Sequence, residues 1–145
     1  MKITSIAFEN QQKIPAKYTC TGENVNPPLQ FLDVPQKAKS LVLIVDDPDA
    51  PMQGAWVHWV VFNIDPTVTS LSEDKKPDGV EGTTSFGQAS YGGPCPPSGT
   101  HRYFFKLYAL DSMLDLTALA DKKAVEEAMD GHILEKTELI GLFSK

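Results

Sequence analysis

Three runs of β-branched and aromatic residues constrain the fold of this chain more than any other feature. They are LVLIV (41–45), WVHWVVFNI (56–64) and HRYFFKLYAL (101–110). The first is short, continuous and aliphatic, which is typical of a strand covered on both faces. The other two have the composition and length of strands. Shorter strand candidates lie at 3–8, 28–33 and 138–143. The sequence therefore predicts a mostly β protein.

One amphipathic helix is expected late in the chain, within DKKAVEEAMDGHILEK (121–136). Val125, Met129 and His132 fall at helical spacing, and Asp121 is suited to cap the first turn. We expect His132 to pack in the core, on the apolar face of this helix.

Length, charge and hydrophobic patterning limit the class of protein. A chain of 145 residues is most simply one domain, covering 1–145, and is long enough to bury a core. No apolar run approaches the ~18 residues that would span a membrane, and the first residues do not resemble a secretory signal. We therefore expect a cytoplasmic protein without membrane insertion. The net charge of −6 argues against nucleic-acid binding.

The two cysteines, Cys20 and Cys95, are far apart in the sequence and do not form a CxxC pair. Two thiols alone make a poor zinc site. In a reducing compartment we expect free thiols, although the sequence does not say whether they meet in space.

Aromatic residues accompany two of the three histidines. Strand alternation puts Trp56 and His58 on one face of their strand, and His101 and Tyr103 on one face of theirs. Arg102 points the other way, which favours a structural ion pair or cover for the neighbouring sheet. Each pair lies at the start of its strand.

The segment VDDPDAP (45–51) is by itself a proline turn with carboxylates. If strands 41–47 and 56–64 are antiparallel neighbours, the end of the first lies beside the start of the second. That pairing would bring Asp47 and Asp49 towards the tryptophan and histidine at the start of the second strand.

The loop YGGPCPPSGT (91–100) leads directly into His101. Its glycines allow close backbone approach with exposed N–H groups, and its prolines stiffen it. Such a wall beside two histidines would suit a small anion. The carboxylates would orient the imidazoles and raise their pKa values, so that each ring donates while positively charged.

Other chemistry is less well supported by the sequence. Ser98, His101 and Asp47 or Asp49 could form a hydrolytic triad, but no G-x-S-x-G elbow is present. His58, His101 and Asp47 are suitable metal ligands without the short spacings that mark a metal site. The histidines could also be ordinary half-buried residues.

The whole chain resembles the phosphatidylethanolamine-binding protein family, in its bacterial Raf-kinase-inhibitor-like branch. The motifs that carry the resemblance are YTCTGENVNPPL (18–29), VDDPDAP (45–51), WVHWVVFNI (56–64), SFGQASYGGPCPPSGTHRYFFKLYALD (85–111) and GHILEKTELIGLFSK (131–145). The combination of D-P-D-A-P with G-T-H-R-Y is highly specific.

The resemblance implies a large central antiparallel sheet packed against a smaller sheet, with a C-terminal helix. It also implies a small anion pocket that accepts phosphate-like groups. By motif position, the ligand-binding residues would be Asp47, Asp49, Trp56, His58, Gly93, Pro94, His101 and Tyr103. Thr21 and Phe31 depart from the family pattern, which usually has Asp and Trp there, and affect rim contacts rather than the pocket.

The sequence thus leads us to expect a non-enzymatic binding protein, with no cofactor and no metal, that holds a small anionic or phosphorylated ligand. The alternative is an inhibitor of a kinase or another enzyme that acts through its surface, with the pocket only regulatory. A Ser/His hydrolase is a third hypothesis. A homodimer is expected by analogy only.

Overall fold

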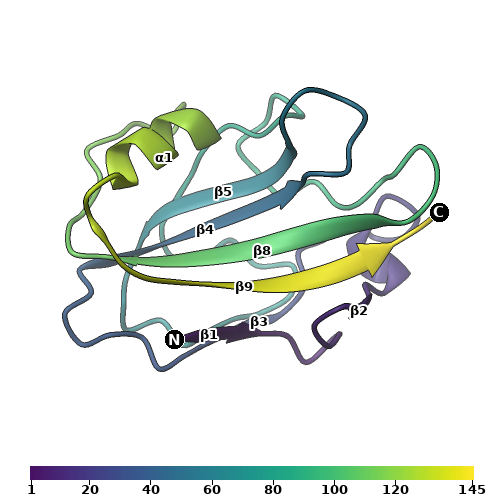
Figure 1. Cartoon of the computed structure of the whole chain (residues 1–145). Helices are drawn as coiled ribbons and strands as arrows, with labels where there is room; N and C mark the ends of the chain where they lie inside the picture. The colour runs from purple at the N-terminus through teal and green to yellow at the C-terminus, as the bar shows by residue number, and fades with distance from the viewer.

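The computed structural model describes residues 1–145 and contains two β-sheets and one α-helix (Figure 1). The strands are β1 (Lys2–Thr4), β2 (Gln12–Lys13), β3 (Leu29–Leu32), β4 (Ser40–Asp47), β5 (Trp56–Ile64), β6 (Ser70–Leu71), β7 (Val80–Glu81), β8 (His101–Leu110) and β9 (Ile133–Phe143). The helix α1 spans Lys122–Met129, and a short 3-10 helix, η1, spans Ala16–Tyr18. The three long predicted strands are confirmed as β4, β5 and β8.

The larger sheet has the strand order β2-β9-β8-β4-β5-β7, and the smaller sheet has the order β1-β3-β6. Neighbouring strands are antiparallel, except that β2 pairs parallel with the end of β9. The predicted mostly β fold with a large and a small sheet is confirmed, with this one parallel pair as an addition.

The small sheet covers one face of the large sheet, below it in Figure 1. Leu43, Trp59 and Phe105 of the large sheet belong to the same buried cluster as Ile3 and Phe31 of the small one. Burial of such side chains contributes roughly 1.5–3 kcal/mol each, so this layer stabilises the fold.

Helix α1 lies against the opposite face of the large sheet (Figure 1). Val42, Val60 and Phe62 form a second buried cluster with Val125 and Met129 of the helix. Strand β4 is consequently buried along its whole length, as its continuous aliphatic sequence predicted.

The late helix is present but shorter than predicted. Asp121 Oδ1 accepts a hydrogen bond from the backbone N–H of Ala124 at 3.0 Å, which confirms the predicted cap. The helix ends at Met129, and Gly131 follows with φ of +81°, a left-handed conformation that terminates helices. The chain then enters β9 at Ile133.

His132 is not a core residue, so the prediction for it is wrong. It lies beyond the end of the helix, with 47% of its side chain exposed, and its Nδ1 is 2.8 Å from Asp111 Oδ1. The helical spacing that suggested a buried position does not extend past Gly131.

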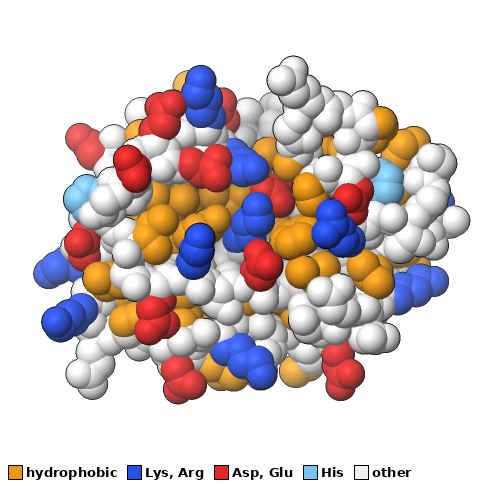
Figure 2. All heavy atoms as spheres, in the orientation of Figure 1, with side chains coloured by type: hydrophobic (Ala, Val, Ile, Leu, Met, Phe, Trp, Pro, Cys, Tyr) orange, Lys and Arg blue, Asp and Glu red, His pale blue; other side chains and the backbone are white.

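None of the chain's helices is long and apolar enough to cross a bilayer. On the face shown in Figure 2, acidic and basic side chains are mixed over the large sheet, and apolar side chains are visible between them.

Candidate functional site

Three strand ends of the large sheet meet at one corner of the molecule. Strand β4 pairs antiparallel with β5, and Asp47 lies opposite Trp56, which confirms the predicted hairpin arrangement. On its other side β4 pairs with β8, with Asp46 opposite Phe104. The last residues of β4 therefore lie between the first residues of β5 and β8.

A β-bulge at His58 interrupts the regular pairing of β5. Val45 lies opposite Trp59 and Asp46 lies opposite Val57, so His58 has no partner in β4. Val57 packs in the helix-side cluster and Trp59 in the cluster between the sheets, whereas strict alternation would put both on one face. Bulges of this kind redirect a side chain next to functional sites, and here His58 faces a cavity.

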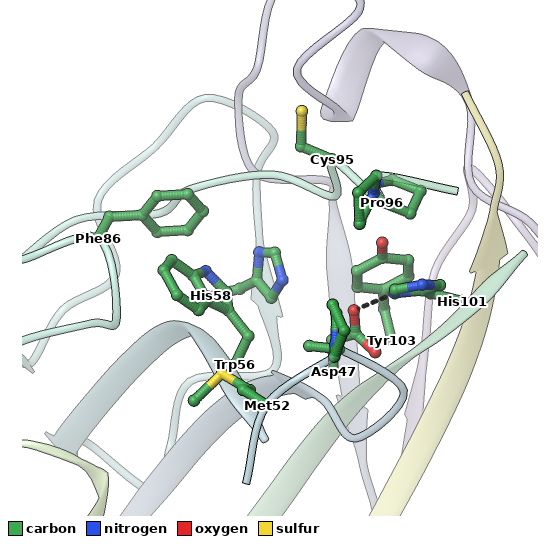
Figure 3. A pocket seen from close by; sticks show the side chains of 12 residues that line it. Asp47, Met52, Trp56, His58, Phe86, Cys95, Pro96, His101 and Tyr103 are labelled. Carbon is green, nitrogen blue, oxygen red and sulfur yellow. Dashed lines mark hydrogen bonds and ion pairs between the residues drawn. The ribbon is translucent and has the colours of Figure 1, made fainter. Parts of the chain in front are cut away.

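The cavity at this corner has a volume of about 300 Å³ (Figure 3). Several residues predicted from the sequence line it: Asp47, Trp56, His58, His101 and Tyr103. The remaining lining residues were not predicted: Ala50, Pro51, Met52, Phe86, Cys95, Pro96 and Pro97. All of them except Met52 lie inside the sequence motifs that carry the family resemblance, so those motifs could have indicated them. Met52 lies outside the motifs.

Asp47 holds the ring of His101 in place. The Nδ1 of His101 is 2.6 Å from Asp47 Oδ2, and the two side chains are 9% and 5% exposed. The other carboxylate oxygen accepts a hydrogen bond from the backbone N–H of Asp49 at 2.8 Å. Because Nδ1 of His101 is engaged, Nε2 is the ring nitrogen left for a ligand.

His58 is held differently, through a backbone carbonyl. Its Nδ1 is 2.7 Å from the carbonyl oxygen of Gly92, so Nδ1 carries the donated proton and Nε2 of the neutral ring is an acceptor. Burial lowers the pKa of His58, and this outweighs the opposing effects of the Gly92 carbonyl and Asp47. The expectation that carboxylates raise the pKa of both histidines is therefore wrong for His58.

The hydroxyl of Tyr103 is buried and has no hydrogen-bond partner. Burial, with smaller contributions from Asp47 and Asp49, raises its pKa above the ordinary value, so the group remains protonated at neutral pH. Its ring centroid lies 5.2 Å from that of His58 and 6.5 Å from that of His101. Buried donors are rarely left unpaired, and the ring that carries this one lies near the rings of both histidines (Figure 3).

The opposite side of the cavity is aromatic and apolar. The Trp56 and Phe86 rings meet edge to face, with centroids 5.4 Å apart, and Phe86 makes a similar contact with His58 at 5.4 Å. Met52 and Phe86 also line the cavity and are 46% and 41% exposed. The cavity thus combines a polar side with an apolar side.

Asp49 does not line the cavity. Its carboxylate forms a two-pronged pair with the Arg102 guanidinium, with Nε–Oδ2 and Nη2–Oδ1 distances of 2.9 Å. This pairing lowers the pKa of Asp49 to about 2. The expected structural ion pair of Arg102 is confirmed. The charge of Asp49 is balanced by the Arg102 guanidinium outside the cavity.

Gly93 and Pro94 also lie outside the cavity lining. The N–H of Gly93, expected to face an anion, donates to Asn24 Oδ1 at 2.8 Å. A Cβ at this position would overlap that oxygen and the carbonyl of Tyr18, so glycine is needed for close packing against the neighbouring turn. The Pro94 carbonyl accepts from the N–H of Cys20 at 3.1 Å. Both residues fasten the loop rather than face the cavity.

Cys20 and Cys95 form a disulfide, so the prediction of free thiols is wrong. The two residues are 75 positions apart in sequence, but their Cα atoms are only 5.4 Å apart. The fold brings the turn after η1 against the loop before β8, a proximity that sequence spacing does not reveal.

The residues that the sequence suggested for a hydrolytic triad or for a metal site do not form such a site at this corner. Ser98 is outside the cavity lining and makes no hydrogen bond to His101. His58, His101 and Asp47 share the cavity without forming a cluster that could hold a metal ion.

Comparisons with known proteins identify the family. The model of the family described as phosphatidylethanolamine-binding protein matches residues 4–144. A "UPF0098 protein" from the archaeon Methanothermobacter thermautotrophicus is 52% identical over 151 residues, which cover 100% of this chain and 99% of the relative. A "UPF0098 protein" from Chlamydia trachomatis is 46% identical over 149 residues, with the same coverage of both chains.

Two solved structures share the fold along nearly their whole length. The phosphatidylethanolamine-binding protein homologue CT736 from Chlamydia trachomatis superposes with a TM-score of 0.97 at 46% identity, covering 99% of this chain and 97% of that one. YbcL of E. coli, described as a new member of the mammalian PEBP family, gives 0.92 at 31% identity, covering 99% and 98%. The chain therefore belongs to the phosphatidylethanolamine-binding protein family.

Proposed function

We propose that this protein is a non-catalytic binding protein whose cavity holds a small anion or the phosphate-like group of a phosphorylated ligand. One observation carries the proposal. The Tyr103 hydroxyl is a buried donor without a partner, in a cavity that it shares with His58 and His101. An unpaired buried hydroxyl costs about 1–3 kcal/mol, which a ligand oxygen would recover.

The polar side of the cavity suits an oxyanion. A doubly protonated His101 would donate Nδ1–H to Asp47 and Nε2–H to the anion, while the Tyr103 hydroxyl donates to a second oxygen. Hydrogen bonds with a charged partner are roughly twice as strong as neutral ones. Neutral His58 would accept from a protonated phosphate oxygen through Nε2. The carboxylate of Asp47 acts on the imidazole and not on the ligand.

The apolar side would contact an organic part of the ligand. The volume of about 300 Å³ is at the lower end of the range of small-molecule sites. Trp56 and Phe86 present ring surfaces to this space. A phosphorylated small molecule would fill both sides.

Isothermal titration with inorganic phosphate and with phosphoethanolamine tests the proposal. We expect both to bind the wild-type protein, and we expect the affinity to fall about tenfold or more for His101→Ala. The matched control is His132→Ala, because His132 also pairs with an aspartate but lies outside the cavity. Equal affinities for wild type and His101→Ala would end the proposal.

Inhibition of a kinase or another enzyme through the protein surface is the other class of function suggested by the sequence. We place it second because the unpartnered donor lies in the cavity and not on the surface. Pull-down of partners with wild type and His101→Ala separates the two: a partner retained equally by both proteins favours a surface role.

A further inference from the structure

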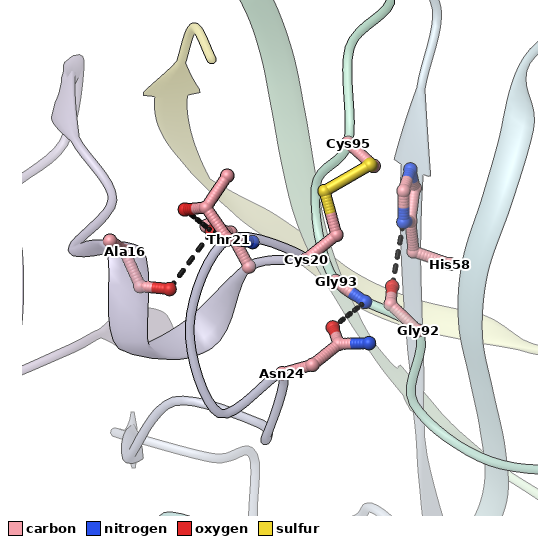
Figure 4. The surroundings of a disulfide bond; sticks show 9 residues. Ala16, Cys20, Thr21, Asn24, His58, Gly92, Gly93 and Cys95 are labelled. Carbon is pink, nitrogen blue, oxygen red and sulfur yellow. Dashed lines mark hydrogen bonds between the residues drawn. A yellow bond between two sulfur atoms is a disulfide. The ribbon is translucent and has the colours of Figure 1, made fainter.

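The cavity wall that contains Cys95 and Pro96 is joined by a covalent bond to a surface turn. The disulfide links Cys95, which lines the cavity, to Cys20 in the turn that follows η1 (Figure 4). Cys20 itself lies outside the cavity lining. The bond therefore connects the binding cavity with a part of the chain that does not contact it.

Single hydrogen bonds run beside this covalent link. The N–H of Cys20 donates to the Pro94 carbonyl at 3.1 Å, and the N–H of Gly93 donates to Asn24 Oδ1 at 2.8 Å. The same loop continues to Gly92, whose carbonyl accepts from His58 Nδ1 at 2.7 Å (Figure 4). A displacement of the loop would thus reach both the cavity wall and the ring of His58.

The disulfide is accessible from solvent. Cys20 and Cys95 are both exposed, and so are the neighbouring turn residues 21–24. Exposed disulfides are the labile and regulatory ones, whereas structural disulfides resist reduction. In the cytoplasm, the location expected from the sequence, disulfides are commonly transient or redox-sensing.

We propose that the Cys20–Cys95 disulfide is a redox switch that sets the affinity of the cavity for its anionic ligand, tight when oxidised and weak when reduced. The inference rests on the proposed function of the cavity. It adds that binding responds to the thiol–disulfide balance of the surroundings.

The reductant would be a dithiol. Its first thiolate attacks one sulfur of the disulfide, forming a mixed disulfide and releasing the other cysteine as a thiolate that takes up a proton. Its second thiolate then closes the reductant's own disulfide and releases the second cysteine. Two electrons and two protons pass from the reductant to Cys20 and Cys95, and oxidation by a disulfide compound reverses the exchange.

Reduction removes the covalent link and leaves the wall held by single hydrogen bonds, those described above together with the bond from the Tyr91 hydroxyl to the Tyr18 carbonyl at 2.7 Å. Net contributions of single hydrogen bonds are modest, so we expect the segments 20–24 and 91–95 to fluctuate more. The wall at Cys95 and the tautomer of His58 would then be less well fixed. Coupling between two events in one protein is commonly 5- to 150-fold in affinity, and we expect a loss of about fivefold or more.

The test is titration of inorganic phosphate against oxidised wild type, wild type reduced with dithiothreitol, and Cys20→Ser. Cys20→Ser removes the bond but leaves every lining residue of the cavity in place. We expect the reduced protein and Cys20→Ser to bind with equal affinity, at least about fivefold more weakly than oxidised wild type. Dithiothreitol should not change Cys20→Ser, and reoxidation should restore the wild-type affinity. Circular dichroism checks that the reduced wild type is still folded. The comparison of reduced with oxidised wild type then tests the proposal even if Cys20→Ser does not fold.

Hydrogen exchange at the amides of Cys20 and Gly93 is a second measurement of how reduction affects the joined segments. Both amides are hydrogen-bonded across the joined segments, so we expect faster exchange after reduction. Equal phosphate affinity in the oxidised and reduced proteins overturns the switch alone. Absence of phosphate binding to the oxidised protein overturns the proposed function and the switch with it, so the two failures are distinguishable.

Discussion

Nδ1 of His101 lies 2.6 Å from Oδ2 of Asp47, with both side chains almost completely buried. The chain contains a second pair of the same kind, His132 with Asp111 at 2.8 Å, in which about half of each side chain is exposed. Water screens the exposed pair, whereas the buried pair fixes a ring at the edge of a cavity. The difference in surroundings makes one pair part of a candidate site and the other a surface contact.

Replacement of Tyr103 by Phe should separate binding from stability. The hydroxyl has no partner in the folded chain, so its removal should leave the free energy of unfolding unchanged or raise it by about 1 kcal/mol. Phosphate affinity should fall about fivefold or more, because a donor to the anion is lost. Urea unfolding and titration calorimetry measure the two effects. The control is Tyr108→Phe, on the helix-side face of the same strand; weaker binding by that variant would contradict the assignment.

Asp47→Asn should weaken phosphate binding while the cavity keeps its shape. With its single oxygen kept on the N–H of Asp49, the asparagine would present its NH2 group, a donor, to His101 Nδ1, and it would not stabilise an imidazolium as a carboxylate does. We expect a loss of about tenfold at pH 6, measured by calorimetry. Asp111→Asn removes the carboxylate of the exposed pair and should have no effect. Unchanged affinity of Asp47→Asn would show that the imidazolium needs no support from this carboxylate.

The stability of the wild-type protein should decrease in acid because of His58. Burial lowers the pKa of this ring below its ordinary value of 6.5, so the unfolded chain takes up the proton more readily than the folded one. The stabilising contribution is complete above about pH 6.5 and is lost as the pH falls below it. His58→Asn retains an N–H that can donate to Gly92 and should show a shallower loss between pH 7.5 and pH 5 in urea unfolding. Parallel slopes would exclude His58 as the cause.

Asp49→Asn should destabilise the protein by up to about 1 kcal/mol at pH 7, the range for a partly exposed ion pair. Arg102 holds the pKa of Asp49 at about 2, below its ordinary value of 3.8. The stabilisation is therefore present above about pH 4 and disappears as the pH falls through 2. Denaturation of wild type and variant should differ at pH 7 and coincide at the acid end. Phosphate affinity should be retained, because Asp49 does not line the cavity.

Reduction of the disulfide should lower the free energy of unfolding by about 4 kcal/mol, because the bond closes a chain segment of 75 residues. Urea unfolding with and without dithiothreitol measures the change. Cys20→Ser should match the reduced wild type and should not respond to the reductant. A difference below about 1 kcal/mol would mean that the open chain is already restrained near these residues.

The main architecture could be predicted because it depends on local patterns. The aliphatic run at 41–45 and the aromatic segments at 56–64 and 101–110 are strands in the structure. The approach of Asp47 to Trp56 followed from antiparallel pairing of neighbouring strands. These features need only composition, strand periodicity and a short connection.

Features that depend on distant parts of the chain could not be predicted in this way. The Cys20–Cys95 bond joins segments 75 positions apart, and neither cysteine has a spacing signal. The hydrogen bond from Gly93 to Asn24 depends on the same contact. The end of the helix is a different case, because Gly131 was a stop signal in the sequence that the helical periodicity of the following residues obscured.

The bulge at His58 frees this position from the demands of sheet pairing. His58 has no partner in β4, so the register that joins β4 to β5 is set by the residues on either side of it. Trp59 and Val57 on either side remain committed to the two buried clusters. The two neighbours of His58 therefore hold the strand in the core, while the unpaired residue between them is turned to the cavity and is held there by the Gly92 carbonyl.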